Sequence, residues 1–116
     1  MIDSKPRFLN GIYPFQGGGL DKISPLSDKL AYAVPGDKRA QLIYFRAGNS
    51  SAELICIVLM RDGQPMRYFP IGAKGAEHVP LAVVEDLSPD TKLDVFIAAP
   101  QGVQGTVVID IGLLEI

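Results

Sequence analysis

The sequence predicts an all-β protein, a two-layer antiparallel β-sandwich of the jelly-roll or immunoglobulin-like kind with about seven strands. Two observations lead to this class. Short apolar runs follow one another from residue 30 onward, and turn-forming residues separate them at intervals of about 8–12 residues. No segment of helical periodicity long enough to connect parallel strands lies between these runs, so antiparallel pairing is favoured.

Each expected strand ends at residues that favour turns. Pro35-Gly36 ends the first strand, Asp62-Gly63 is typical of a hairpin turn, and Ser88-Pro89-Asp90 marks a later turn. The seven strands are expected over residues 30–34, 39–47, 53–60, 66–71, 77–84, 91–99 and 105–116.

The last strand shows the alternation that a sandwich requires, with one apolar face and one mixed face. Val107 and Ile109 share the apolar face, and Asp110 and Gly112 lie on the other. The run Leu54–Met60 differs because it is apolar at every position apart from its cysteine. A two-layer sandwich covers only one face of a strand. We therefore expect the other face of this run to be covered by the N-terminal segment or by a second subunit.

Residues 1–29 have a different character from residues 30–116. Turn formers such as Pro6, Asn10-Gly11 and Gly17-Gly18-Gly19 interrupt scattered apolar residues. This composition predicts an irregular N-terminal arm that packs on a β-sandwich domain formed by residues 30–116.

Composition excludes several classes of partner. The net charge is -2 and no run rich in Lys or Arg occurs, so we expect no nucleic-acid binding. No signal-peptide pattern and no apolar stretch of about 20 residues is present, which predicts no membrane association and a cytoplasmic location. Asn49-Ser50-Ser51 matches a glycosylation sequon, but without a secretory signal we interpret it as a turn.

Catalytic and metal-binding residues are not indicated, and no cofactor is expected. Cys56 lies within an apolar run, where a thiol is unreactive, and no G-x-S-x-G motif positions a nucleophilic serine. One histidine and one buried cysteine do not make a zinc or copper site of the usual kinds. Calcium bound by the turn carboxylates Asp62, Asp86 and Asp90 stays open as an alternative, although no EF-hand pattern supports it.

The candidate binding site is a surface of tyrosine and arginine side chains. Tyrosine offers a flat apolar ring with a polar tip, and arginine offers a forked donor, so together they suit sugars, carboxylates or protein partners. The patch requires the strand 39–47 to lie beside the hairpin centred on Asp62-Gly63. Its residues are Tyr44, Arg46, Asn49, Arg61, Arg67 and Tyr68. The alternative is ordinary cross-strand pairing with Asp94 or Asp110 as ion partners.

Three functions follow from these observations. The first is a non-catalytic interaction protein, a self-associating β-sandwich that acts as a homo-oligomeric subunit or an adaptor for a protein partner. The second is a small ligand-binding module of the carbohydrate-binding kind that uses the Tyr/Arg surface. The third is an enzyme in which His78, near Glu77 or Asp86, transfers protons.

Overall fold

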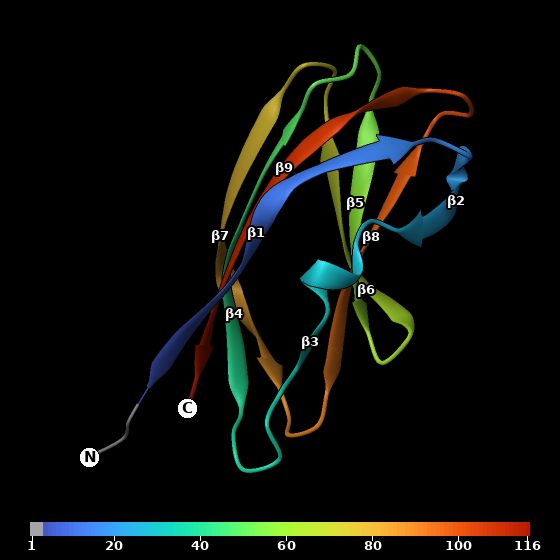
Figure 1. Cartoon of the computed structure of the whole chain (residues 1–116). Helices are drawn as coiled ribbons and strands as arrows, with labels where there is room; N and C mark the ends of the chain where they lie inside the picture. Colours follow the sequence, from blue (N-terminus) through green and yellow to red (C-terminus); the bar gives the residue numbers. More distant parts are fainter. Residues whose placement is uncertain (1–3) are drawn as a thin grey trace.

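The computed structural model describes residues 4–116, apart from the side chains of residues 82–85. Two antiparallel sheets pack face to face (Figure 1), and a short 3-10 helix, η1, lies between two strands of the same sheet. The elements are β1 (Lys5–Gln16), β2 (Gly19–Pro25), η1 (Asp28–Leu30), β3 (Tyr32–Ala33), β4 (Ala40–Asn49), β5 (Ile55–Arg61), β6 (Gln64–Ile71), β7 (Ala76–Leu87), β8 (Lys92–Ala99) and β9 (Gln104–Glu115).

The strand order confirms the predicted sandwich and selects the jelly-roll alternative. Sheet A has the order β1-β9-β4-β7, and sheet B has the order β2-β8-β5-β6, with β3 also paired to β8. Successive strands pass from one sheet to the other, except for the β5–β6 hairpin and the β2–β3 pair within sheet B. This arrangement of eight principal strands is the double Greek key of a jelly roll. Six of the seven expected segments form strands of seven residues or more, and the segment 30–34 forms only the two-residue strand β3 after η1.

The expected irregular arm is wrong for the residues that the structure describes. β1 pairs with β9 from Lys5 opposite Glu115 to Gln16 opposite Gln104, and β2 joins the edge of sheet B. Residues 5–25 are therefore part of the sandwich, although residues 1–3 lie outside the description. Turn formers such as Pro6 and Gly11 are tolerated here because an edge strand pairs on one side only.

Proline positions follow the strand order closely. The four outermost strands β1, β2, β6 and β7 all contain proline, and the four inner strands β9, β4, β8 and β5 contain none. Proline lacks the backbone N–H that an inner strand must donate, and on an outer strand it disfavours pairing with another chain. The strand prolines are Pro6, Pro14, Pro25, Pro65, Pro70 and Pro80.

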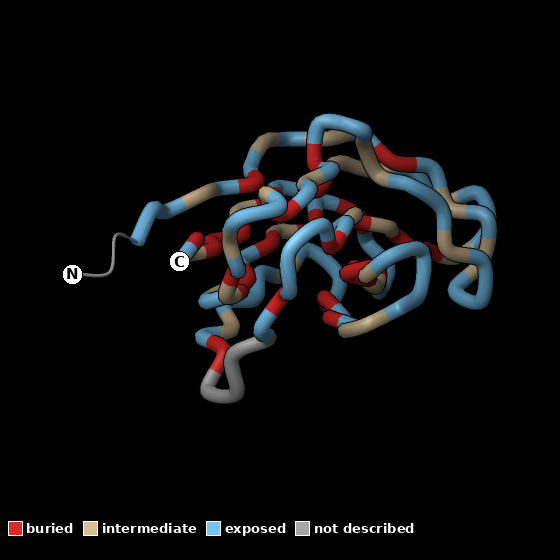
Figure 2. The backbone as a smooth tube through the Cα atoms, turned by 90° about the horizontal axis from the view of Figure 1, so that it is seen from below, coloured by how far each residue is buried: buried red, intermediate tan, exposed pale blue. Residues whose placement is uncertain are grey.

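The core lies between the two sheets. Phe45 of β4 stacks on Phe69 of β6 across the interface, with ring centroids 4.0 Å apart and an interplanar angle of 9°. Buried and exposed positions alternate along much of the backbone (Figure 2), as strands with one covered face require. Burial of each large aliphatic side chain contributes about 1.5–3 kcal/mol.

β5 is buried on both faces within a single chain. Ile57 and its inward neighbours belong to the core, whereas Val58 and Met60 face outward and are still buried. The register places Val58 between Tyr68 of β6 and Phe96 of β8, and these larger aromatic side chains flank it. Burial of this face therefore does not require the second subunit that the sequence pattern suggested.

A polar cluster joins the two sheets near the end of the chain. Glu115 of β9 is buried, accepts a hydrogen bond from the Tyr32 hydroxyl and pairs with Arg7, whose Nε lies 3.2 Å from the Glu115 carboxylate. The Tyr32 hydrogen bond is the largest influence on this carboxyl. Together with the Arg7 charge, it lowers the pKa of Glu115 below its ordinary value despite burial. Tyr32 belongs to sheet B and Glu115 to sheet A.

Replacing Tyr32 with Phe tests this cluster. Because the pKa of Glu115 is lowered from 4.5, its ionised form stabilises the fold above that pH, and the contribution is lost as the pH falls through the lowered value. Tyr32→Phe is expected to lower the free energy of unfolding by about 1.5–3 kcal/mol at pH 7. The difference from wild type should shrink in acid, as measured by urea denaturation at several pH values.

Tyr13→Phe is the matched control, because the Tyr13 hydroxyl donates to the uncharged Asn10 carbonyl oxygen. Its effect on stability should not change across the same acidic range. A Tyr32→Phe effect that does not shrink as the pH falls below 4.5 would contradict the assignment.

Candidate functional site

The structure divides the predicted Tyr/Arg patch between two sheets. Tyr44 and Arg46 lie on β4 in sheet A, whereas Arg61, Arg67 and Tyr68 belong to the β5–β6 hairpin in sheet B. β4 pairs with β9 and β7, so it does not neighbour the hairpin as the prediction required. The reason is that the chain crosses from one sheet to the other between β4 and β5.

Asn49 lies inside the protein rather than on a binding surface. Its side-chain amide donates to the Glu53 carbonyl oxygen at 2.8 Å and lies within hydrogen-bond distance of the Ile71 and Gly72 carbonyl oxygens. Its side-chain oxygen accepts from the Ser51 backbone at 2.9 Å. Asn49 therefore ties the end of β4 to the end of β6, and the residue has a structural role in the turn that the sequence predicted.

Tyr44 and Arg46 belong to a different candidate site, which lies on the outer face of sheet A. The register brings four polar side chains into one line across the sheet, which we call the polar row: Asn10 of β1, Asp110 of β9, Arg46 of β4 and His78 of β7. Directly paired residues of neighbouring strands have adjacent side chains. The polar row therefore gathers residues from four strands that are distant in the sequence.

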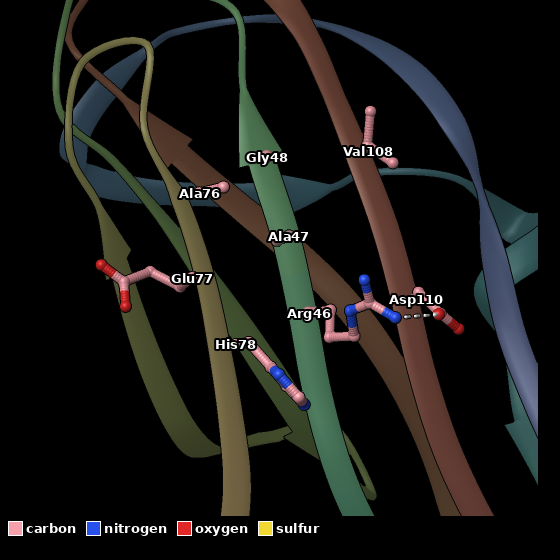
Figure 3. Close-up of a pocket in the computed structure, with 8 residues that line it drawn as sticks. All are labelled: Arg46, Ala47, Gly48, Ala76, Glu77, His78, Val108 and Asp110. Carbon is pink, nitrogen blue, oxygen red and sulfur yellow. Dashed lines mark ion pairs between the residues drawn. The ribbon is translucent and has the colours of Figure 1, made fainter.

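Contacts within the polar row hold its centre in place. Arg46 Nη1 lies 3.7 Å from Asp110 Oδ2 (Figure 3), and the Tyr44 hydroxyl donates to Asp110 Oδ1 at 3.0 Å. The Tyr44 ring meets His78 edge to face, with centroids 6.3 Å apart. Burial, reinforced by the Asp110 carboxylate, raises the pKa of Tyr44. Asp110 is thus the acceptor on which both neighbouring side chains converge.

An apolar row lies beside the polar row. It consists of Ile12, Val108, Gly48 and Ala76, which are paired across the same four strands. Ile12 is 68% exposed and Val108 is 49% exposed, which is unusual for such side chains. An open pocket extends over Gly48 and Ala76, between Val108 and the polar row (Figure 3).

An aromatic row flanks the polar row on its other side, formed by Phe8, Gly112, Tyr44 and Pro80. The Tyr44 ring lies directly over Gly112, because a Cβ atom built on this glycine would come within 2.0 Å of the ring. Gly112 therefore allows Tyr44 to lie flat and reach Asp110. Phe8 is 56% exposed on the far side of the glycine.

Sequence reasoning missed most of this site. The mixed face of β9 was recognised, but Asp110 was considered only as an ion partner and His78 only as a catalytic group. Phe8, Asn10 and Ile12 lie outside the predicted site because the composition of residues 1–29 predicts an irregular arm rather than the strand β1. Leu9, Tyr13 and Phe15 fall on alternate positions, and this pattern is the signal for a strand that tolerates proline at a sheet edge.

The structure does not bring the considered catalytic partners together. Glu77 points away from His78 in Figure 3, and Asp86 pairs with Arg39. Burial raises the pKa of the Cys56 thiol, which disfavours the reactive thiolate.

The turn carboxylates do not form a cluster. Asp62 accepts a hydrogen bond from the Lys92 backbone at 2.9 Å, and Asp86 is engaged by Arg39. Among the described residues, no group of three or more His, Cys, Asp or Glu side chains is placed to hold a metal ion. The part of the chain that the structure covers also contains no helix long and apolar enough to cross a membrane.

Comparison with known proteins identifies the fold but no family. No family model matches the chain, and no curated protein matches it. Among solved structures, the CBM36-1 domain of a multidomain xylanase from the hindgut metagenome of Trinervitermes trinervoides is similar, with a TM-score of 0.57 and 11% identity over 95% of this chain and 96% of that chain. This likeness supports the class of the fold, a β-sandwich.

Two further structures show weaker likeness. A chain of infectious bursal disease virus strain Gx has a TM-score of 0.44 and 12% identity, covering 97% of this chain and 36% of that chain. The exo-β-1,3-galactanase of Phanerochaete chrysosporium, solved with galactose, has a TM-score of 0.38 and 10% identity, covering 93% and 29% respectively.

Replacing Gly112 with Ala tests how the site is built. The new methyl group must displace the Tyr44 ring, so Gly112→Ala is expected to lower the free energy of unfolding by about 1–3 kcal/mol. Gly48→Ala is the matched control in the same face, since its Cβ would meet only Val108 at an ordinary 3.9 Å. That variant should be neutral, or more stable by about 0.5 kcal/mol. Equal losses in urea denaturation would contradict the proposed packing of Tyr44.

Proposed function

We propose that this protein is a non-catalytic binding module that binds neutral carbohydrate on the outer face of sheet A. The observation that carries the proposal is the polar row between two rows that expose apolar surface. Sugars have the same mixed character, because their hydroxyl groups form hydrogen bonds while their C–H faces pack on apolar and aromatic side chains.

The chemistry of the polar row suits hydroxyl groups better than ions. Arg46 only donates hydrogen bonds, and an ionised Asp110 only accepts them. A hydroxyl group does both, so it can satisfy these neighbours together. The two charges are adjacent and of opposite sign. Asp110 therefore disfavours a bound anion, and Arg46 disfavours a bound cation.

The likeness to a carbohydrate-binding module is consistent with this proposal but does not carry it. At 11% identity, the CBM36-1 domain shares the fold with this chain, and a fold does not specify a ligand. The argument for carbohydrate rests on the side chains of sheet A.

A binding screen with matched variants tests the proposal. The probes are soluble xylan, mannan and mixed-linkage β-glucan as neutral polysaccharides, with polygalacturonate as an acidic one, measured by affinity electrophoresis and calorimetry. Wild type should bind at least one neutral polymer, and Arg46→Ala should weaken binding about tenfold or more, since Arg46 is a central donor. Arg46 is largely exposed and its ion pair is long, so this variant should remain folded.

Tyr68→Ala provides the control, because Tyr68 is an exposed aromatic residue in sheet B. Its binding should equal that of wild type. Binding to polygalacturonate alone would overturn the assignment. So would a loss of binding in Tyr68→Ala while Arg46→Ala still binds like wild type. No binding to any of the four polymers would count against a carbohydrate ligand altogether.

Self-association is the second candidate function, and the exposure of Phe8, Ile12 and Val108 on one face favours it. The prolines on all four outermost strands disfavour association through strand edges, so two copies would have to meet face to face. A homo-oligomer, a protein partner and a cytoplasmic location all stay predictions.

Sedimentation velocity at micromolar concentration tests self-association. If the apolar row forms an interface, wild type should sediment as a dimer, and Ile12→Asp should return it to a monomer by placing a charge in the contact. Leu20→Asp is the control, since Leu20 is an exposed apolar residue on β2, in the other sheet. A monomeric wild type would exclude this second function.

A further inference from the structure

The polar groups of the outer face of sheet A are arranged across the strands rather than along them. Each of the strands β1, β9 and β4 carries one polar side chain in the polar row, with a residue of the aromatic row on one side and of the apolar row on the other. In strand order these triplets are Phe8, Asn10 and Ile12; Gly112, Asp110 and Val108; and Tyr44, Arg46 and Gly48.

This arrangement sets the direction and the length of a matching ligand. Within these three rows, a ligand lying along β1 or β9 would meet a single polar side chain, whereas one lying across the strands meets four. Four neighbouring strands span three interstrand spacings, or about 14 Å. That distance exceeds the width of any single sugar ring, so one monosaccharide cannot contact the whole polar row.

The polar row is also open at both ends. It begins at β1 and finishes at β7, which are the two outermost strands of sheet A. Its terminal residues, Asn10 and His78, are both exposed. A polymer is therefore able to continue past either end of the row.

We propose that the polar row binds an internal stretch of about three units of a linear neutral glycan, lying across the strands from β7 to β1. This inference rests on the proposed function and deepens it, because it names the part of the carbohydrate that is recognised. A chain end is not required, and both the reducing and the non-reducing end extend beyond the sheet.

Calorimetry with oligosaccharides of increasing length tests the proposal. The probes are xylose to xylohexaose and glucose to cellohexaose, together with the hexasaccharides whose reducing end has been converted to an alditol. Affinity should rise about tenfold or more from the monosaccharide to the trisaccharide and then level off, because longer chains add no contacts to the row. The alditol hexasaccharide should bind as tightly as the unmodified one.

Variants at the two ends of the row sharpen the test. Asn10→Ala and His78→Ala each remove one terminal group, so each should reduce the gain in affinity between disaccharide and trisaccharide by several-fold. Tyr68→Ala should reproduce the wild-type series. Circular dichroism melts check that the variants are folded.

Several outcomes separate this inference from the proposed function. Binding of a monosaccharide as tightly as a trisaccharide, or loss of binding to the alditol, would overturn the inference while the carbohydrate-binding function stands. Affinity that keeps rising from trisaccharide to hexasaccharide would also overturn the proposed length. No binding to any member of either series, when the neutral polymers also fail to bind, would overturn the proposed function itself.

Discussion

The position of β9 between β1 and β4 is the constraint on which the site depends. β9 pairs with both neighbours over most of its length, so it sets the register of three strands at once. That register places Asn10, Asp110 and Arg46 in one line. A shift by one residue along β9 would turn Asp110 into the core and expose both Ile109 and Ile111. Burial of the apolar face of β9 therefore stabilises the sandwich and aligns the candidate binding groups.

Asp110 and Gly112 link the packing of this face to the arrangement of its polar side chains. Gly112 provides the space in which the Tyr44 ring lies flat, and Tyr44 in turn donates a hydrogen bond to Asp110. Arg46 approaches the same carboxylate from its own strand. The centre of the polar row is thus held in place by contacts within the protein, and such pre-ordering would reduce the entropy lost on binding the proposed ligand.

Edges and faces have different roles in this sandwich. Prolines on the outermost strands protect the edges against pairing with other chains, while the outer face of sheet A exposes isoleucine, valine and phenylalanine side chains. The outer face of sheet B is closed in the middle, where Val58 is buried between larger neighbours. Recognition is therefore better supported on sheet A than at the strand edges.

The sequence alone determined the fold class, six of the seven expected strands from residue 30 onward and the mixed face of the last one, because alternation and turn chemistry are local properties. The proline positions also carry information about strand order, since proline occurs within the outermost strands and not within the inner ones. Only the tertiary structure decided that Tyr44 and Arg46 lie apart from Arg61, Arg67 and Tyr68. Only it placed Asn49 in the interior and paired β1 with β9. Strand pairing joins residues far apart in the chain, and no local pattern specifies which strands become neighbours.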